Sequence, residues 1–188
     1  MDDGYSLKDD KKLLEAYSKG DNKAFETFYL RHKDGLYRFL IFISKEENVS
    51  VDIMQKTFLK LIEKKKDFLW RETVHPKRWL YRVAINFWKD ELRKNRRKKE
   101  EDIQDIEDIQ DNRYFEKDDT LINAVRESVS NLHLKYRLVV SLRYFGGLSI
   151  EEISRVLKIP QGTVKSRLNK AMLVLFDSLK KYKDIINL

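Results

Sequence analysis

One short string, from Ser149 to Pro160, restricts the fold more than any other part of the chain. Ser149 and Glu152 have the spacing of a capping box, in which each side chain accepts a hydrogen bond from the other residue's backbone amide. Pro160 ends that short helix, because proline disfavours helical geometry in the residue before it, and it can open the next helix. A short helix, a tight turn and a second helix make a helix-turn-helix, which we predict over Ser149–Leu175.

The second helix of this motif has an apolar face and a polar face. At about 100° per residue, Val164, Leu168, Ala171 and Leu175 gather on the core side. The opposite side offers small residues for close approach, donors for base edges and cations for phosphates, so we predict that it reads the major groove of duplex DNA. The alternative is a solvated face on an ordinary helical hairpin. The candidate DNA-reading residues are Gln161, Gly162, Thr163, Lys165, Ser166, Arg167, Asn169 and Lys170.

The rest of the chain also favours helices. Glycine (6) and proline (2) are scarce among the 188 residues, and no Asn-Gly or Asp-Gly pair lies between runs of sustained apolar-polar alternation, as a hairpin would require. Apolar residues recur at three- and four-residue steps, and Gly146-Gly147 marks the end of a helix that supports the motif. The predicted fold class is all-α.

Charge divides the chain into three parts. Residues 1–99 hold 25 basic and 16 acidic residues, residues 100–120 hold 2 and 10, and residues 121–188 hold 12 and 5. Like-charge repulsion favours an extended chain in the middle part. We predict an N-terminal helical domain (1–99), a flexible acidic linker (100–120) and a C-terminal helix-turn-helix domain (121–188). The alternative for the linker is one exposed helix with an isoleucine stripe.

A strongly basic helix is predicted from Pro76 to Lys99. Its apolar residues share one face, and a cationic stripe opposite them suits a phosphate backbone. Trp79 at the edge of the stripe offers a stacking surface for an unpaired base, with core packing as an equal alternative, whereas Trp88 is assigned to the core. Solubility is the alternative for the stripe. The candidate nucleic-acid-binding residues here are Trp79, Arg82, Asn86, Lys89, Arg93, Arg96 and Arg97.

Several classes of function are disfavoured. The chain has no cysteine, so disulfides and thiolate metal sites are excluded, which suits the cytosol. The acidic N-terminus, Met1 to Gly4, is unlike a signal peptide, and the longest apolar run is too short to span a membrane. The three histidines, His32, His75 and His133, lack ligand spacing, so we predict no catalytic residue, no metal, no cofactor and no small-molecule substrate. The net charge of +8 points to an anionic partner.

Taken in their order along the chain, the motifs resemble those of the extracytoplasmic-function (ECF) group of the bacterial sigma-70 family of transcription initiation factors. The resemblance extends from about Leu13 to Leu179 and rests on the strings Asp52-x-x-Gln55-x-x-Phe58-Leu59, Trp79-Leu80-x-x-Val83-Ala84-x-Asn86, Tyr136-Arg137-x-Val139, and Ile159-Pro160-x-Gly162-Thr163-Val164. Lys56 stands where an acidic residue is common, Leu132-His133-Leu134 lacks a common proline, and Lys158 replaces the usual glycine of the turn.

The resemblance implies a cytoplasmic factor without an active site, which binds core RNA polymerase and promoter DNA. It implies that the helix-turn-helix reads the −35 element, and that the basic helix holds the non-template strand of the −10 element together with the loop around residues 68–75. It also implies an anti-sigma partner, which in this group is often anchored in a membrane, and a linker that threads the polymerase's RNA path. Core polymerase would bind Asp52, Gln55, Phe58, Leu59 and Ile62.

Two other functions stay open at this point. A stand-alone helix-turn-helix regulator would bind specific DNA tightly as a free dimer, but it leaves the tryptophan string unexplained. An enzyme would need a pocket with clustered reactive groups.

Overall fold

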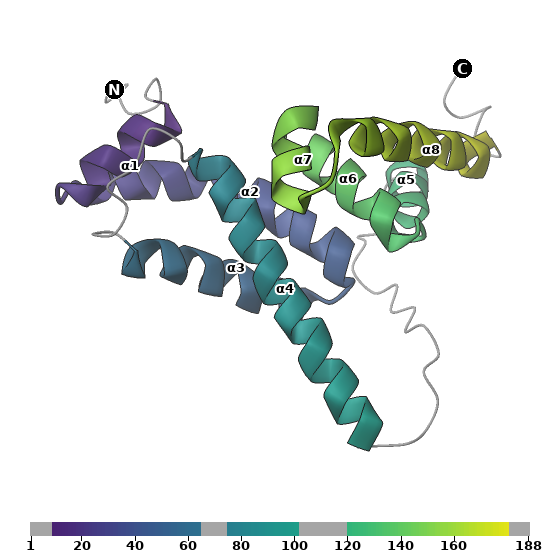
Figure 1. Cartoon of the computed structure of the whole chain (residues 1–188), viewed down its shortest axis with the longest axis horizontal. Coiled ribbons are helices and arrows are strands. Elements are labelled where there is room, and N and C mark those ends of the chain that lie inside the picture. The colour runs from purple at the N-terminus through teal and green to yellow at the C-terminus, as the bar shows by residue number, and fades with distance from the viewer. Residues whose placement is uncertain (1–8, 65–74, 102–119, 181–188) are drawn as a thin grey trace.

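The computed structural model describes residues 9–64, 75–101 and 120–180, and the loop expected at 68–75 therefore lies almost entirely outside the described residues. All regular structure in these ranges is helical, which confirms the predicted fold class (Figure 1). The eight helices of these ranges are α1 Asp10–Ser18, α2 Asn22–Ser44, α3 Glu47–Glu63, α4 Pro76–Glu101, α5 Thr120–Ser130, α6 Leu134–Tyr144, α7 Ile150–Leu157 and α8 Gln161–Leu179. None of them is both long and apolar enough to cross a membrane.

Local sequence explains where several helices begin and end. Asp9 caps α1 by accepting a 2.8 Å hydrogen bond from the Lys12 amide, and Asp21 caps α2 in the same way through Ala24. Lys45 and Lys158 end α2 and α7 in the left-handed conformation, with φ of 63° and 55°. Glycine usually occupies such positions, because a Cβ there crowds the backbone.

The four N-terminal helices surround the first part of the core. Leu14 of α1, Phe28 of α2, Leu61 of α3 and Ala84 of α4 are all buried. Trp88 is also buried, as predicted. α4 continues past this core as a long projecting helix (Figure 1).

The four C-terminal helices have a smaller cluster of their own. Val129, Leu132, Val140, Ala171 and Leu175 bury their side chains between α5, α6 and α8. α6 ends at Tyr144, close to the Gly146-Gly147 pair that the sequence predicts as the end of the supporting helix, and Leu132 lies in the turn before α6.

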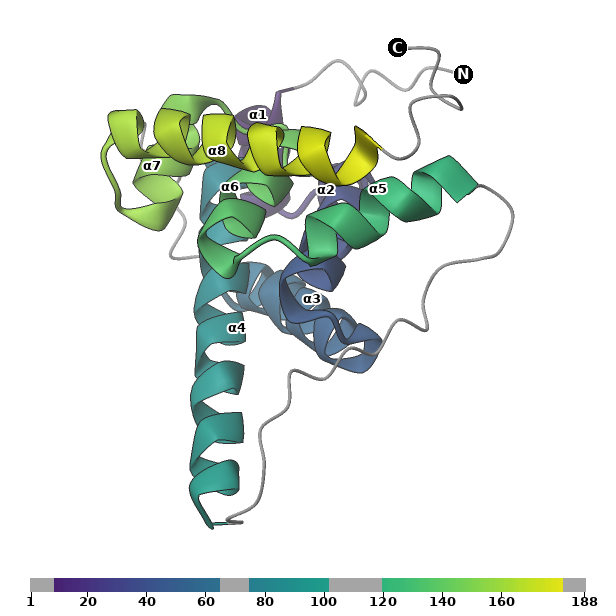
Figure 2. The ribbon, with the colours of Figure 1, turned by 90° about the vertical axis from the view of Figure 1, so that its right-hand side faces the viewer.

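The two groups of helices pack directly on each other. α6 lies against α2, and α7 lies against α4 (Figure 2). Phe42 of α2 belongs to the C-terminal cluster, while Val139 and Ile153 join the N-terminal core. Charge patterning predicts a tether between two domains, but it does not predict this contact. Residues 100, 101 and 120 of the expected linker are helical, and the remainder lies outside the described residues.

Candidate nucleic-acid interface

The predicted capping box begins α7. The Ser149 amide donates to Glu152 Oε2 at 2.8 Å, and the Glu152 amide donates to Ser149 Oγ at 3.1 Å. Both atoms of the pair satisfy amides that the first turn of a helix leaves without partners. Ile153 and Val156 then bury the inner face of this short helix. The capping box therefore stabilises the start of α7, and the buried side chains hold the helix against the core.

The turn between α7 and α8 needs a left-handed residue, and Lys158 supplies it. The Lys158 amide donates to the Ser154 carbonyl, and the Ser154 hydroxyl donates to the Ile159 carbonyl at 2.6 Å. The sequence predicts that Pro160 can open α8. In the structure Pro160 is the N-cap residue, and the first helical residue is Gln161. Lys158 therefore adopts the left-handed conformation that glycine would adopt in this turn, but at a higher conformational energy.

α8 presents the predicted polar face to solvent. Val164, Ala171 and Leu175 are buried on the inner side, and Leu168 is partly buried there. Gly162 has open space on its outer side: apart from its chain neighbours and the adjacent backbone of α8, no described atom lies within 4 Å of the point that a Cβ would occupy. Thr163 and Arg167 are half-buried, and the exposed members of the predicted set are Gln161, Gly162, Lys165, Ser166, Asn169 and Lys170.

α4 presents a second polar face. Arg82, Asn86, Lys89 and Arg93 are exposed, and Trp79 is half-buried at the edge of the core. Arg93 Nη1 donates to Asp90 Oδ1 at 2.9 Å, an exposed pair that leaves the guanidinium in solvent. Arg96 and Arg97 lie on the same helix, although their side chains are outside the described residues.

The third predicted surface lies on α3 and does not contain every residue assigned to it. Asp52 and Gln55 are exposed, Leu59 is 56% exposed and Ile62 is 43% exposed. Phe58 is instead 5% exposed, with its ring 4.7 Å from the Tyr29 ring in an edge-on contact. Helical geometry explains the difference, because Phe58 is adjacent to Thr57 and Leu61 on the inner side of α3. Phe58 supports the exposed surface from beneath.

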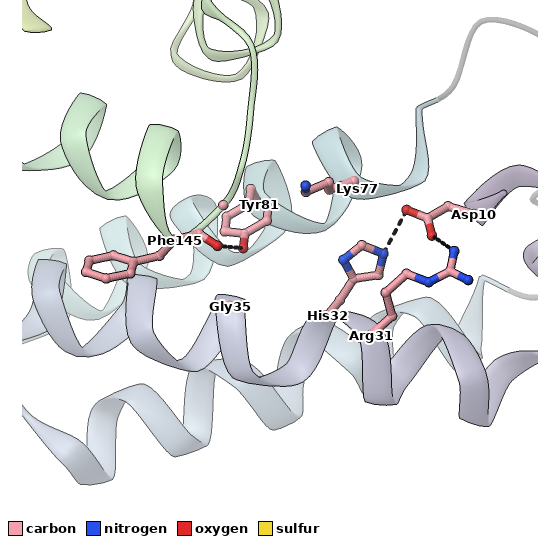
Figure 3. Close-up of a pocket in the computed structure, with 8 residues that line it drawn as sticks. Asp10, Arg31, His32, Gly35, Lys77, Tyr81 and Phe145 are labelled. Atoms are coloured by element: carbon pink, nitrogen blue, oxygen red, sulfur yellow. Dashed lines mark hydrogen bonds and ion pairs between the residues drawn. The ribbon is translucent and has the colours of Figure 1, made fainter. Parts of the chain in front are cut away.

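The sequence gives no indication of a polar cluster between α1 and α2. Asp10 Oδ2 is 2.7 Å from His32 Nε2, and Asp10 Oδ1 accepts from Arg31 Nη1 at 2.7 Å (Figure 3). Burial raises the pKa of the Asp10 carboxyl, but the hydrogen bonds and charges of His32 and Arg31 outweigh it, so that the pKa lies below its ordinary value. These residues line a cavity of about 410 Å³ that continues to Lys77, Tyr81 and Phe145. Because Asp10 and His32 are 22 positions apart, no local spacing could reveal the pair.

Charge and shape suit the α4 and α8 faces to nucleic acid. No group of three or more histidine, cysteine, aspartate or glutamate side chains in the described ranges could hold a metal ion. The α8 face combines open backbone approach with amide and cationic donors, which is what base reading in a groove requires. The α4 face is a line of cations beside an indole ring, which suits a single strand.

Two family models match the chain on either side of the acidic middle segment. The model described as Sigma-70 region 2 covers residues 28–98, and the model described as Sigma-70, region 4 covers residues 122–175. The first includes α3 and most of α4, and the second includes the helix-turn-helix. The two matches thus contain every surface described above except the N-terminal part of the Asp10 cluster.

Curated relatives match over most of their length. The ECF RNA polymerase sigma-E factor of Haemophilus influenzae is 30% identical over 175 residues, which cover 86% of this chain and 90% of the relative. The RNA polymerase sigma-H factor of Pseudomonas aeruginosa is 28% identical over 178 residues, covering 86% and 89%.

Solved structures share the fold. The sigma factor RpoE from Bartonella quintana, in complex with the anti-sigma factor NepR, superimposes with a TM-score of 0.69 at 25% identity and covers 84% of this chain and 98% of that one. CnrH, in complex with the cytosolic domain of CnrY, gives 0.67 at 22% identity, over 92% and 97%.

Proposed function

The chain belongs to the sigma-70 family, in its ECF group, and we infer that it binds core RNA polymerase and directs it to promoters with specific −10 and −35 elements. The observation that carries this inference is the presence of two different exposed faces with cationic and polar side chains on one chain, on α4 and on α8. A stand-alone helix-turn-helix regulator needs only the second face. The family matches and the relatives' names support the sigma factor and not the regulator.

We propose that α8 reads the −35 duplex. A recognition helix enters the major groove with its N-terminal residues first. At that end Gly162 has open space for close approach to DNA, and Asn169 and Lys170 follow on the exposed side. An asparagine amide can pair with a base edge, and a lysine can reach a phosphate or a guanine.

We propose that α4 holds the opened −10 element. Arg82, Lys89 and Arg93 would follow the backbone of the non-template strand, with Asn86 between them and Trp79 as the stacking surface. Extruding a base from a duplex costs a few kcal/mol, least where the duplex is already weak. Cations along one helix do not supply that energy alone, so melting is expected to require polymerase.

We propose that the exposed surface of α3 docks on the polymerase. Leu59 and Ile62 give it an apolar centre, and Gln55 and Asp52 give it a polar edge. Lys56 stands where the family commonly has an acid, and its amine lies 2.5 Å from Asp52 Oδ2, so the pair neutralises its own charge. Phe58 supports this surface by packing beneath it and does not itself touch the polymerase.

We propose three functional units for the chain: residues 1–99 for polymerase and −10 binding, 100–120 as linker, and 121–188 for −35 binding. The chemistry belongs to the polymerase, so this chain acts as an initiation factor and not as an enzyme. Core polymerase and promoter DNA place its action in the bacterial cytoplasm. An anti-sigma factor is a further expected partner, supported by the Bartonella quintana complex.

One transcription experiment tests this function. The full-length protein is mixed with sigma-free bacterial core polymerase and a library of promoter fragments, and run-off transcripts are measured. We expect transcripts from a subset of fragments that share two elements. Absence of transcripts on every template, together with tight specific DNA binding by the free protein, would contradict the sigma factor and support the regulator.

A further inference from the structure

A cavity of about 410 Å³ lies where α1, α2, α4 and the turn after α6 meet (Figure 3). Sites that hold a small organic molecule usually have a volume of roughly 300–1,000 Å³. The α1 and α2 side of the cavity carries Asp10, Arg31 and His32, and the α4 side carries Lys77 and Tyr81. These side chains are polar, and they belong to none of the three surfaces proposed above for DNA and polymerase.

The one carboxylate among the lining residues is already paired with basic side chains. Asp10 Oδ1 accepts a hydrogen bond from Arg31, and Asp10 Oδ2 lies 2.7 Å from His32 Nε2. His32 is buried, and the centroid of its ring lies 4.5 Å from that of the Phe28 ring, so packing holds the pair in place. Lys77 forms no ion pair with any acidic side chain of the described ranges. Two permanent cations and one carboxylate therefore line the cavity, and this balance favours an anion.

Two donors of the cavity form only long hydrogen bonds with backbone carbonyls. Lys77 Nζ donates to the Gly147 carbonyl at 3.4 Å, and the Tyr81 hydroxyl donates to the Phe145 carbonyl at 3.5 Å. Hydrogen bonds are usually about 2.7–3.2 Å long, and a charged oxygen forms shorter and stronger ones than a carbonyl does. Burial raises the pKa of the Tyr81 hydroxyl, so the group keeps its proton and stays a donor. An oxyanion could therefore engage both donors without breaking a strong contact.

We propose that this cavity binds a small organic anion, whose phosphate or carboxylate head is held by Lys77 and Tyr81. The head alone would fill a small part of the cavity, because a water molecule takes up only about 30 Å³ of liquid, and the remaining volume accommodates an organic body. The paired Asp10, Arg31 and His32 form the wall beside that body. This site goes beyond the proposed function, which requires no small ligand, so each can be tested without the other.

Glycine signals in NMR spectra allow a direct test, because the chain has only six glycines. Full-length protein labelled with nitrogen-15 at glycine alone gives one amide signal for each of them. Gly35 and Gly146 line the cavity, whereas Gly162 lies on the exposed α8 face. The protein is titrated with ribose 5-phosphate, with citrate and with uncharged ribose, while chloride keeps the ionic strength constant.

We expect the Gly35 and Gly146 signals to shift and to saturate with at least one of the two anions, and to stay unchanged with ribose. The anion that binds more tightly identifies the head as phosphate or carboxylate. Unchanged Gly35 and Gly146 signals with both anions would overturn the proposal. A shift of the Gly162 signal alone would also overturn it, because the anion would then bind the basic α8 face.

Three variants separate the cavity from the general positive charge of the protein. Lys77→Gln should weaken anion binding about tenfold, since it removes a charged donor, and Tyr81→Phe should weaken it about threefold, since it removes a neutral one. Lys89→Gln is the matched control, because it removes the same charge from an exposed position about 18 Å further along α4. The control should change the affinity by less than about twofold, since salt screens charges at that distance.

The comparison of the two lysine variants decides between a defined site and general attraction. If Lys77→Gln and Lys89→Gln weakened anion binding equally, the anion would respond to net charge and the proposal would be wrong. Thermal unfolding without ligand shows whether each variant is folded. If Tyr81→Phe is unfolded, the two lysine variants and the glycine signals of the unchanged chain still give the answer.

Discussion

The α8 face and the α4 face are both basic, but they differ in what surrounds their cations. On α8, Lys165 and Lys170 alternate with small or uncharged residues, and Gly162 leaves backbone open to a ligand. On α4, Arg82, Lys89 and Arg93 follow one another with Asn86 among them. Phosphate contacts supply affinity without sequence information, whereas base edges supply selectivity. We therefore expect α4 to contribute more of the affinity and α8 more of the choice of promoter.

The largest effect is expected from removing two cations of α4. Arg82→Ala combined with Lys89→Ala should lower run-off transcription about 30-fold, since two backbone contacts disappear. It should also reduce the slope of log affinity against log salt by about 1.4 for a single-stranded −10 segment. The measurement is holoenzyme binding to a pre-opened promoter fragment at several salt concentrations.

The control for this pair is Lys12→Ala combined with Lys19→Ala, which removes the same charge from exposed positions in α1 and at its C-cap. If the α4 substitutions only reduced the overall electrostatic attraction to DNA, both double variants would lose promoter binding equally. An equal loss would show that the α4 cations act through net charge alone.

A smaller effect with a different pattern is expected at Lys170. Lys170→Ala should weaken initiation about tenfold on promoters that have the −35 element, as expected for a contact at or beside a base edge. Templates without that element should be affected much less. Run-off transcripts from matched templates measure the difference, and an equal loss on both would remove Lys170 from the base-reading face.

The sequence predicts the helix-turn-helix well because its determinants are local. Ser149 and Glu152 cap each other across three residues, and Val164, Ala171 and Leu175 share a face through helical periodicity alone. The family resemblance, which the family-model matches confirm, identifies the order of the surfaces. Phe58 is the informative exception, because a motif position can be retained for packing as well as for contact.

The direct contact between the two groups of helices could not be predicted in this way. Gly35 of α2 lies close to the Phe145 carbonyl in this contact, but the two residues are 110 positions apart, and nothing in either local pattern indicates the other. The charge change at residues 100–120 suggests a division of the chain, but charge patterning carries no information about whether two helical units touch. A glycine in the middle of α2 is the one signal that could have raised the question.

A modest effect is expected at Gly162. Gly162→Ala meets open space, and alanine favours a helix over glycine by up to about 1 kcal/mol, so the free protein should be no less stable. If DNA approaches this backbone, the added methyl should weaken −35 duplex binding about threefold, which is less than the roughly 1–3 kcal/mol that an extra methylene costs in a well-packed core. Binding titrations and thermal unfolding on the same variant separate the two effects, and unchanged binding would place the DNA elsewhere on α8.

The smallest effect concerns the turn that orients α8, and it should appear in stability and not in promoter choice. Lys158 is exposed and left-handed, a conformation that costs a residue with a Cβ about 1–2 kcal/mol. Glycine would remove this cost, but its greater freedom in the unfolded chain would cancel part of the gain in stability. Lys158→Gly should therefore raise the free energy of unfolding by about 0.5–1 kcal/mol in denaturant titrations. Lys158→Ala removes the same charge but keeps the Cβ, so it should give no such gain. If both variants gained equally, the charge of Lys158 and not its backbone would be the source of the cost, and the turn would be as relaxed with lysine as with glycine.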